Sequence, residues 1–384
     1  MIWVIVILCI AGSVLAGEPE LNFQDIQQQA MGGAGVAVLN PNTAMQRNPA
    51  ALAYTKTYYA LPLSFGAVIS TDVVKRFDQF RDMQNHPDDK DLQSDILKDM
   101  VPTKVGLLNY LTPLSFISKG FGLSVYARTS VQGRLKRPTS PVMEMIGFAD
   151  IVPALGYARQ FSIRGLTGAL GLSVKYIHRI QIYDETNAHT QLIYGQSDLL
   201  KYFNDKPDKK EPGILSMNGY GVDIGWISPF KFREWGSGHC GLTIQNIGAR
   251  ISGTRTLLTD TEDVSLALPT TATLGVGFHP SFPETLPVLG WGTMTIALDY
   301  KFISPHEAFV KNLYIGIEHS LFNNILKLRG GLHQGFVVGG LGVDIPFGGS
   351  YGLHLQYART AEEMGSQIGY NTFQYHVVEI GFSY

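Results

Sequence analysis

The sequence is poor in cysteine and in charge. Its 384 residues include 2 cysteines, and charged residues make up 16% of the chain. Cys9 lies in the first apolar run, so only Cys240 remains once that run is removed, and no intrachain disulfide can then form. The formal net charge of −2 is nearly balanced and indicates no polyanionic partner. We therefore expect no disulfide framework and no nucleic-acid binding.

The sequence also lacks the short motifs of common catalytic and metal sites. Its histidines show no His-Glu-x-x-His or other metal-ligand spacing, and no Gly-x-Ser-x-Gly elbow occurs. Cys240 has no apparent base, which favours an inert thiol over a nucleophile. Gly33-Ala34-Gly35 lacks the third glycine of a dinucleotide-binding loop, and no βαβ unit surrounds it. We expect no enzyme, no cofactor and no bound metal.

Long apolar runs are confined to the N-terminus. Residues 1–16 form such a run and end in Val14-Leu15-Ala16, which is typical of a signal peptide. The run is shorter than the roughly 20 residues that a membrane-spanning helix needs. The alternative to a signal peptide is a membrane anchor that is retained. We interpret 1–16 as a signal peptide that is removed, so that the exported chain begins near Gly17.

The rest of the chain shows period-two alternation many times over. Leu170, Leu172 and Val174, for example, alternate with Gly171 and Ser173. Each segment is about as long as a tilted strand that crosses a bilayer, and a sheet in lipid must close to leave no open edge. We expect an all-β protein, a transmembrane antiparallel barrel of about fourteen strands. These are predicted at 57–70, 104–112, 120–132, 149–162, 166–183, 215–228, 239–252, 269–279, 292–303, 311–321, 324–333, 335–346, 350–359 and 373–384.

The connections support this topology, because bacterial barrels have short periplasmic turns and longer outer loops. With the C-terminus on the periplasmic side, long and short connections mostly alternate. The predicted outer loops are 71–103, 133–148, 184–214, 253–268, 304–310, 334 and 360–372. The predicted inner turns are 113–119, 163–165, 229–238, 280–291, 322–323 and 347–349.

Eleven charged side chains in the predicted strands share the less apolar face. That face should be the lumen, because a charge that faces lipid at mid-bilayer costs roughly 2–4 kcal/mol. Arg159 breaks the parity, near the periplasmic end of its strand, where its side chain can reach the interface. A soluble β-sandwich, the alternative fold, would not need such long strands. The charged residues are Arg128, Lys175, Arg179, Asp223, Asp299, Lys301, Glu318, Lys327, Arg329, Asp344 and Glu379.

Residues 30–53 are rich in glycine and alanine and precede the first strand. Gly32, Gly33 and Gly35 permit a close approach of the backbone to its surroundings. The segment ends in Asn48-Pro49-Ala50, where the proline disfavours a helix at the residue before it. We interpret 17–55 as a plug inside a barrel formed by 56–384; a glycine-rich turn before the first strand is the alternative.

The last strand carries Val378, Ile380, Phe382 and Tyr384 on one face. An alternating final strand that ends in an aromatic residue resembles the signal read by the outer-membrane barrel assembly machinery. Together with the signal peptide, it predicts a location in the outer membrane, in contact with its lipid.

Two motifs carry a family resemblance. Met31-Gly32-Gly33-Ala34-Gly35-Val36-Ala37 and Asn48-Pro49-Ala50-Ala51-Leu52 resemble the N-terminal hatch of the FadL/TodX family of outer-membrane transporters of fatty acids and hydrocarbons. The C-terminal part, with Asn323 to Gly331, Gly340 to Val343 and Tyr357 to Gly365, looks like PorV-like relatives of the type IX secretion machinery. The resemblance implies a fourteen-stranded barrel with a plug. For a transporter it also implies capture of an apolar ligand at the outer loops, a shift of the plug and a sideways exit.

Candidate ligand residues follow from that mechanism. Phe77 and Phe80 in loop 71–103 and Leu199, Tyr202 and Phe203 in loop 184–214 are candidates for an apolar capture groove; alternatively, these segments only cover the barrel mouth. In the lumen, Tyr126 is a candidate contact, and Arg128, Lys175 and Arg179 are candidate cations for a fatty-acid carboxylate, unless they pair with lumen acids such as Asp223. Three functions stay open: a transporter of apolar small molecules, narrowly ahead; a binding module for secreted proteins; and a barrel without a ligand.

Overall fold

The computed structural model describes residues 25–40, 43–55, 58–60, 64–86, 89–101, 103–118, 120–163, 165–185, 192–195, 213–257, 260–282, 292–303, 309–347, 352–363 and 372–383. The predicted signal peptide lies outside the described residues, as do Leu199, Tyr202, Phe203 and Tyr384.

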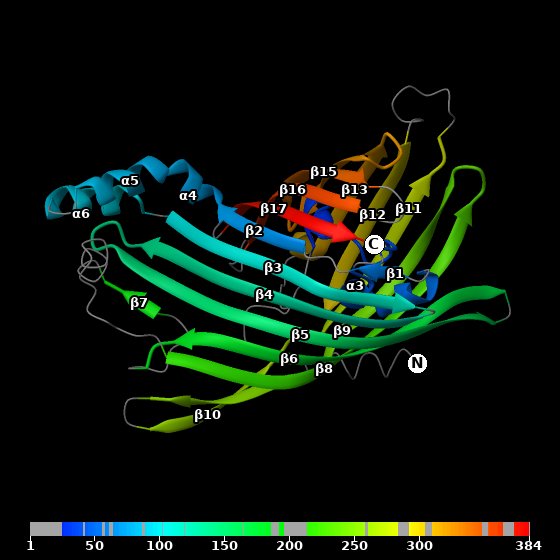
Figure 1. The fold of residues 1–384 in the computed structure, drawn as a ribbon, viewed down its shortest axis with the longest axis horizontal. Coiled ribbons are helices and arrows are strands. Elements are labelled where there is room, and N and C mark those ends of the chain that lie inside the picture. Colours follow the sequence, from blue (N-terminus) through cyan, green and yellow to red (C-terminus); the bar gives the residue numbers. More distant parts are fainter. Residues whose placement is uncertain are drawn as a thin grey trace.

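Fourteen of the described strands form a closed antiparallel barrel (Figure 1). The barrel closes where β2 (Ser64–Ser70) pairs with β17 (Thr372–Ser383) on one side and with β3 (Thr103–Ser118) on the other. Neighbours in the ring are neighbours in the chain, apart from short extra strands between them. This confirms the predicted fold class. The other members are β4 (Phe121–Lys136), β5 (Val142–Ile163), β6 (Leu166–Tyr183), β8 (Gly213–Phe232), β9 (Gly236–Thr256), β11 (Thr271–Pro280), β12 (Gly292–Ile303), β13 (Leu313–Leu321), β14 (Leu326–His333), β15 (Phe336–Pro346) and β16 (Gly352–Glu363).

Several predicted loops were too long, because strand pairing continues beyond the alternating core. Lys136 pairs with Val142, so the predicted loop 133–148 shrinks to the connection 137–141. The predicted loop 253–268 contains β10 (Thr261–Ala267), which extends a hairpin from β9. The strand predicted at 57–70 contains both β2 and a separate short strand, β1 (Tyr58–Ala60), which pairs with β3. One further short strand was missed, β7 (Leu192–Tyr194) beside β5.

Two predicted inner turns are also mostly strand. The ladder between β8 and β9 runs as far as the pair Phe232 and Gly236, within the predicted turn 229–238. The predicted turn 113–119 is wrong, since β3 continues through Pro113 to Ser118. Its pairing with β4 is irregular between Leu111 and Leu114. This irregularity accommodates a proline, which cannot donate a ladder hydrogen bond.

The strands present an apolar face outward and a mixed face to the lumen. On β6, Leu170, Leu172 and Val174 are exposed, whereas Ser173 and Lys175 are buried. The same alternation exposes Val378, Ile380 and Phe382 of the predicted assembly signal, and Arg159 and Tyr157 share the outer face of β5. Seven of the predicted lumen charges are buried: Lys175, Arg179, Asp223, Asp299, Lys301, Glu318 and Arg329.

The predicted outer loop 71–103 folds into helices α4 (Thr71–Lys75), α5 (Phe77–Asn85) and α6 (Lys90–Asp99). They lie beyond one end of the barrel, at the left of Figure 1. Met83, Leu97 and Met100 pack with Leu135 of β4 into a small buried cluster, so the helices are anchored to a strand end. None of the helices in the described residues is long and apolar enough to cross a membrane.

Candidate functional site

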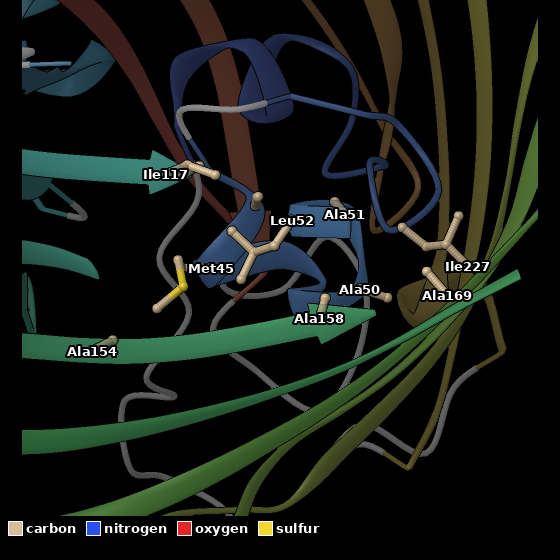
Figure 2. Close-up of a cluster of buried hydrophobic side chains, with 10 residues drawn as sticks. Met45, Ala50, Ala51, Leu52, Ile117, Ala154, Ala158, Ala169 and Ile227 are labelled. Atoms are coloured by element: carbon tan, nitrogen blue, oxygen red, sulfur yellow. The ribbon is translucent and has the colours of Figure 1, made fainter. Parts of the chain in front are cut away.

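A short helical segment lies inside the barrel, as predicted for the plug. It consists of α2 (Ile26–Ala30), α3 (Ala44–Arg47) and the 3-10 helix η2 (Pro49–Tyr54). Figure 2 shows Met45 and Leu52 of this segment facing the inner wall of the barrel. They pack with Ile117, Ala154, Ala158, Ala169 and Ile227 of β3, β5, β6 and β8. Burial of these side chains provides an apolar seat for the segment.

The Asn48-Pro49-Ala50 motif fixes the segment to β8 and β9. The Asn48 Oδ1 atom accepts a hydrogen bond from the Ala50 N–H at 3.1 Å, which caps η2. The Asn48 Nδ2 atom donates to the carbonyl oxygens of Val36 and of Trp226 on β8, each at 3.1 Å. One buried side chain thus links two parts of the segment to the wall.

The wall approaches the segment through glycines. An added Cβ at Gly225 would lie 2.0 Å from Asn48 Oδ1, and one at Gly171 would lie 2.3 Å from the Ala50 nitrogen. Gly171 and Gly225 are direct cross-strand partners. Gly171 belongs to the alternating pattern of its strand, but the pattern alone gives it no role. We call the following residues the glycine belt: Gly122, Gly156, Gly171, Gly225, Gly241, Gly275, Gly277, Gly316, Gly331 and Gly340.

The glycines of the segment itself also lie close to neighbouring atoms. Gly32 and Gly33 have φ angles of +68° and +88°, a region that side chains disfavour. A Cβ at Gly33 would lie 2.7 Å from the ring of Tyr314 and 2.8 Å from that of His333. His333 Nδ1 lies 3.1 Å from the carbonyl oxygen of Gly32, a hydrogen-bonding distance.

A buried carboxylate holds the next residues of the segment. Asp299 on β12 is 1% exposed, and its Oδ2 accepts hydrogen bonds from the backbone N–H groups of Gly35 at 2.6 Å and Val36 at 2.9 Å. Arg47 forms an ion pair with Asp25 within the segment and closes over Gly35, where a Cβ would lie 2.7 Å from Arg47 Nη1. Sequence analysis placed Asp299 in the lumen but assigned it no contact.

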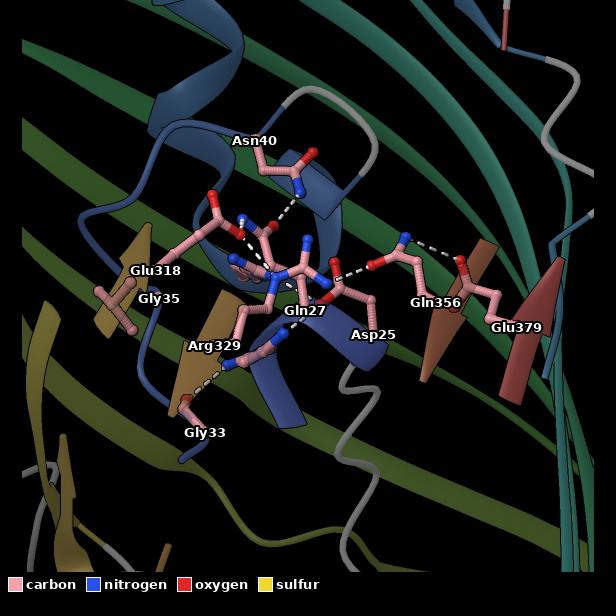
Figure 3. A network of polar contacts seen from close by, with 12 residues as sticks. Asp25, Gln27, Gly33, Gly35, Asn40, Glu318, Arg329, Gln356 and Glu379 are labelled. Atoms are coloured by element: carbon pink, nitrogen blue, oxygen red, sulfur yellow. Dashed lines mark hydrogen bonds and ion pairs between the residues drawn. The ribbon is translucent and has the colours of Figure 1, made fainter. Parts of the chain in front are cut away.

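A polar network joins the segment to the C-terminal strands (Figure 3). Gln27 Nε2 donates to Glu318 Oε2 on β13 at 3.0 Å. The same oxygen accepts a hydrogen bond from Arg329 Nε on β14 at 2.6 Å, and Arg329 Nη1 donates to Gln356 on β16 at 2.7 Å. These polar contacts hold the segment to β13 and, through Arg329 of β14, connect it to β16.

The candidate lumen cations have acidic or aromatic neighbours. Lys175 Nζ lies 2.8 Å from both carboxylate oxygens of Asp223. Arg179 forms a two-pronged ion pair with Asp150, at 2.6 and 2.9 Å. The Arg128 guanidinium lies 5.2 Å from the centre of the Phe148 ring. Pairing with lumen acids was the alternative to a ligand role, and a ligand role for these cations remains a prediction.

Apolar side chains fill the lumen around the ion pairs. The candidate Tyr126 is 5% exposed and belongs to this cluster. Most of the cluster was not singled out from the sequence, because single apolar residues on a lumen face give no recognisable motif. Its buried members are Tyr126, Val152, Ile177, Tyr183, Leu215, Met217, Ala249, Ile251 and Leu268.

Of the candidates from the outer loops, Phe77 does not join this cluster. Phe77 begins α5 with 61% of its surface exposed. Phe80 lies on the same helix, and its side chain, like the whole of Leu199, Tyr202 and Phe203, lies outside the described residues. Of the predicted ligand residues, the structure brings together Tyr126, Lys175 and Arg179 on β4 and β6, beside Arg128.

Comparison with known proteins gives structural likeness only. No family model and no curated protein matches the sequence. The toluene transporter TodX of Pseudomonas putida matches with a TM-score of 0.48 and 12% identity over 95% of this chain and 98% of its own. The toluene transporter TbuX of Ralstonia pickettii matches with a TM-score of 0.45 and 11% identity over 94% and 98% of the two chains. A FadL homologue of Pseudomonas aeruginosa matches with a TM-score of 0.32 and 10% identity over 97% and 99%. Each of these matches spans nearly the whole of both chains.

Proposed function

We propose that the chain is an outer-membrane channel for small apolar molecules and that residues 25–55 are its plug. The main support is the contact between this segment and the glycine belt. The segment is held inside the barrel by hydrogen bonds and side-chain packing, which are reversible interactions. The outward apolar face supports a location in a membrane. The motifs that resemble the FadL/TodX hatch are the same residues that contact the wall, which supports a channel.

The proposed path begins among the outer helices and continues along the apolar lumen cluster to the plug. For a sideways exit, the irregular stretch of β3 between Leu111 and Leu114 is the candidate, since the ladder to β4 is interrupted there. Pro113 within it offers no N–H to restore the ladder. The proposed ligands are apolar small molecules, such as a long-chain fatty acid or a hydrocarbon.

Uptake into liposomes tests the proposal. The purified chain is reconstituted, and entry of a long-chain fatty acid is followed with a fluorescent sensor inside the vesicles. Substitution of Gly33 or Gly35 with Trp should impair uptake more than assembly, since the indole would meet Tyr314 and His333, or Arg47. Gly330→Ala is the control, because its Cβ would meet no atom closer than 3.8 Å. No uptake by the parent chain would refute the proposal, and equal loss of uptake and assembly would exclude a moving plug.

The buried ion pairs in the lumen favour a second function, the binding of secreted proteins. A binding module for secreted proteins, as in the PorV-like relatives, needs a filled lumen and a stable plug. The buried ion pairs Lys175–Asp223 and Arg179–Asp150 occupy the lumen together with the apolar cluster. Co-purification of a stoichiometric exported protein, with no exchangeable small molecule in a native mass spectrum, would favour this function.

A further inference from the structure

The outer face of β6 and β8 carries a cluster of polar and aromatic side chains. The cluster consists of Tyr176, His178, Asn218 and Tyr220. On β6 it follows an outward apolar strip formed by Leu170, Leu172 and Val174. Tyr176 donates a hydrogen bond from its hydroxyl to Asn218 Oδ1 at 2.5 Å, and His178 Nδ1 lies 2.7 Å from the same oxygen. The Tyr176 ring packs against that of Tyr220, with centroids 5.3 Å apart. Asn218 is exposed, and both of these contacts involve its Oδ1 atom, so its amide N–H groups remain available as donors.

An outward cation completes the cluster. Arg250 on β9 is the direct cross-strand partner of Tyr220 and is exposed. Its guanidinium has no hydrogen bond or ion pair to any described residue. Strands β6 and β9 contain no Asp or Glu, and the only one on β8, Asp223, is buried in the lumen with Lys175. Within these three strands, the outer face at this height therefore carries the positive charge of Arg250 and no acidic side chain.

The height of the cluster matches a membrane boundary. Near the other end of β8, Phe230 stacks on Phe278 of β11 with ring centroids 6.3 Å apart, an aromatic pair of the kind found at the opposite interface. Phe230 and Tyr220 are ten positions apart on β8. At about 3.3 Å per residue and a tilt of about 40°, the strand between them rises about 25 Å, the height of the apolar band of outer-membrane barrels. The cluster would thus lie at the level of the lipid headgroups, where Tyr is enriched.

We propose that Arg250, Asn218 and Tyr220 form a binding site for the phosphate of an anionic lipid in the outer leaflet. This inference rests on the proposed membrane location but not on transport. The guanidinium and the amide supply donors to phosphate oxygens, and the tyrosine rings contact the glycerol and the upper acyl chain. Tyr357, Arg359 and His376 form a second outward set on β16 and β17, with the Tyr357 hydroxyl 2.8 Å from His376 Nδ1. Here the Arg359 guanidinium also donates a long hydrogen bond, of 3.5 Å, to Gln374. This set makes a second site of the same kind.

Native mass spectrometry of the full chain in a neutral detergent tests the site. The probes are dimyristoyl phosphatidylglycerol and dimyristoyl glycerol, which differ in the phosphate-bearing headgroup. We expect the parent chain to retain phosphatidylglycerol selectively and Arg250→Gln to lower its affinity about fivefold, the effect of one basic residue near an anionic surface. Arg250→Gln combined with Arg359→Gln should remove the selectivity, and Arg250→Lys should restore part of it.

Arg255→Gln is the matched control, since Arg255 lies on the same strand and is already paired with Glu262. It should bind phosphatidylglycerol like the parent chain. Resistance of the folded barrel to sodium dodecyl sulfate without heating shows that each variant is folded. Equal binding of dimyristoyl glycerol, or unchanged binding by folded Arg250→Gln, would overturn the site. Failure of fatty-acid uptake would refute the transport function and leave this result standing.

Discussion

The carboxylate of Asp299 on β12 accepts a hydrogen bond from the backbone N–H of Gly35 at 2.6 Å. The two residues are 264 positions apart in the chain. The carboxylate also accepts the Val36 N–H, so a wall side chain satisfies two consecutive donors of a segment that has no ladder partner there. A single acid of the wall therefore defines where this part of the plug lies.

Asp299→Ala should loosen the plug locally. The two N–H groups of Gly35 and Val36 would lose their acceptor, and each buried unsatisfied donor costs about 1–3 kcal/mol. We expect hydrogen exchange of these two amides, followed by mass spectrometry in detergent, to accelerate at least about tenfold. Asp344→Ala is the control, because Asp344 pairs with Lys327 and His354 within the wall. Equal protection in the parent chain and Asp299→Ala would contradict this role.

Gly225→Val should prevent the plug from seating. Its first side-chain atom would lie 2.0 Å from Asn48 Oδ1 and 2.9 Å from the Ala50 nitrogen, well inside contact distance. We expect trypsin to cleave after Arg47 in the folded variant, whereas the parent chain, in which Arg47 is 5% exposed, is protected. Gly330→Val tests for the general effect of valine in a strand and should leave Arg47 protected. Protection of Arg47 in both variants would show that the glycine belt is not required.

Lys175→Met should destabilise the barrel itself. It leaves Asp223 buried without its cation, and loss of one partner from a buried pair costs about 3–5 kcal/mol. The urea midpoint for unfolding in detergent should fall accordingly. The double variant Lys175→Met with Asp223→Leu should recover much of the loss, since no buried charge remains unpaired. If the double variant is no more stable than Lys175→Met alone, the ion pair is not the cause.

A lysine placed on the outer face should report depth in the membrane. Leu172→Lys lies near the middle of the apolar strip of β6 and should destabilise the barrel in lipid by about 2–4 kcal/mol, whereas Tyr220→Lys at the proposed boundary should cost about 0–1 kcal/mol. Both positions are largely exposed, at 49% and 67%, so burial within the protein does not separate them. Unfolding in lipid vesicles gives the comparison. Equal costs would place the membrane boundary elsewhere.

All fourteen barrel strands lie where alternation predicted them, and β6 and β12 match their predicted bounds. Their ends were less accurate, because pairing between neighbours extends strands into residues that do not alternate. The hairpin of β9 and β10 is an example: Arg255 and Glu262 pair across it, but lie in a segment that reads as a polar loop.

The sequence by itself determined the period-two pattern, the lumen side of the seven buried charges and the small, close-packing character of residues 30–53. These properties follow from local geometry, since successive side chains of a strand point to opposite faces. Only the tertiary structure decided the partner of each buried charge. Lys175 pairs with Asp223 and Arg179 with Asp150, and Asp299 accepts a hydrogen bond from the backbone N–H of Gly35. These partners lie on different strands or on the plug. Barrel closure and register bring them together, and neither is encoded in any short stretch of the chain.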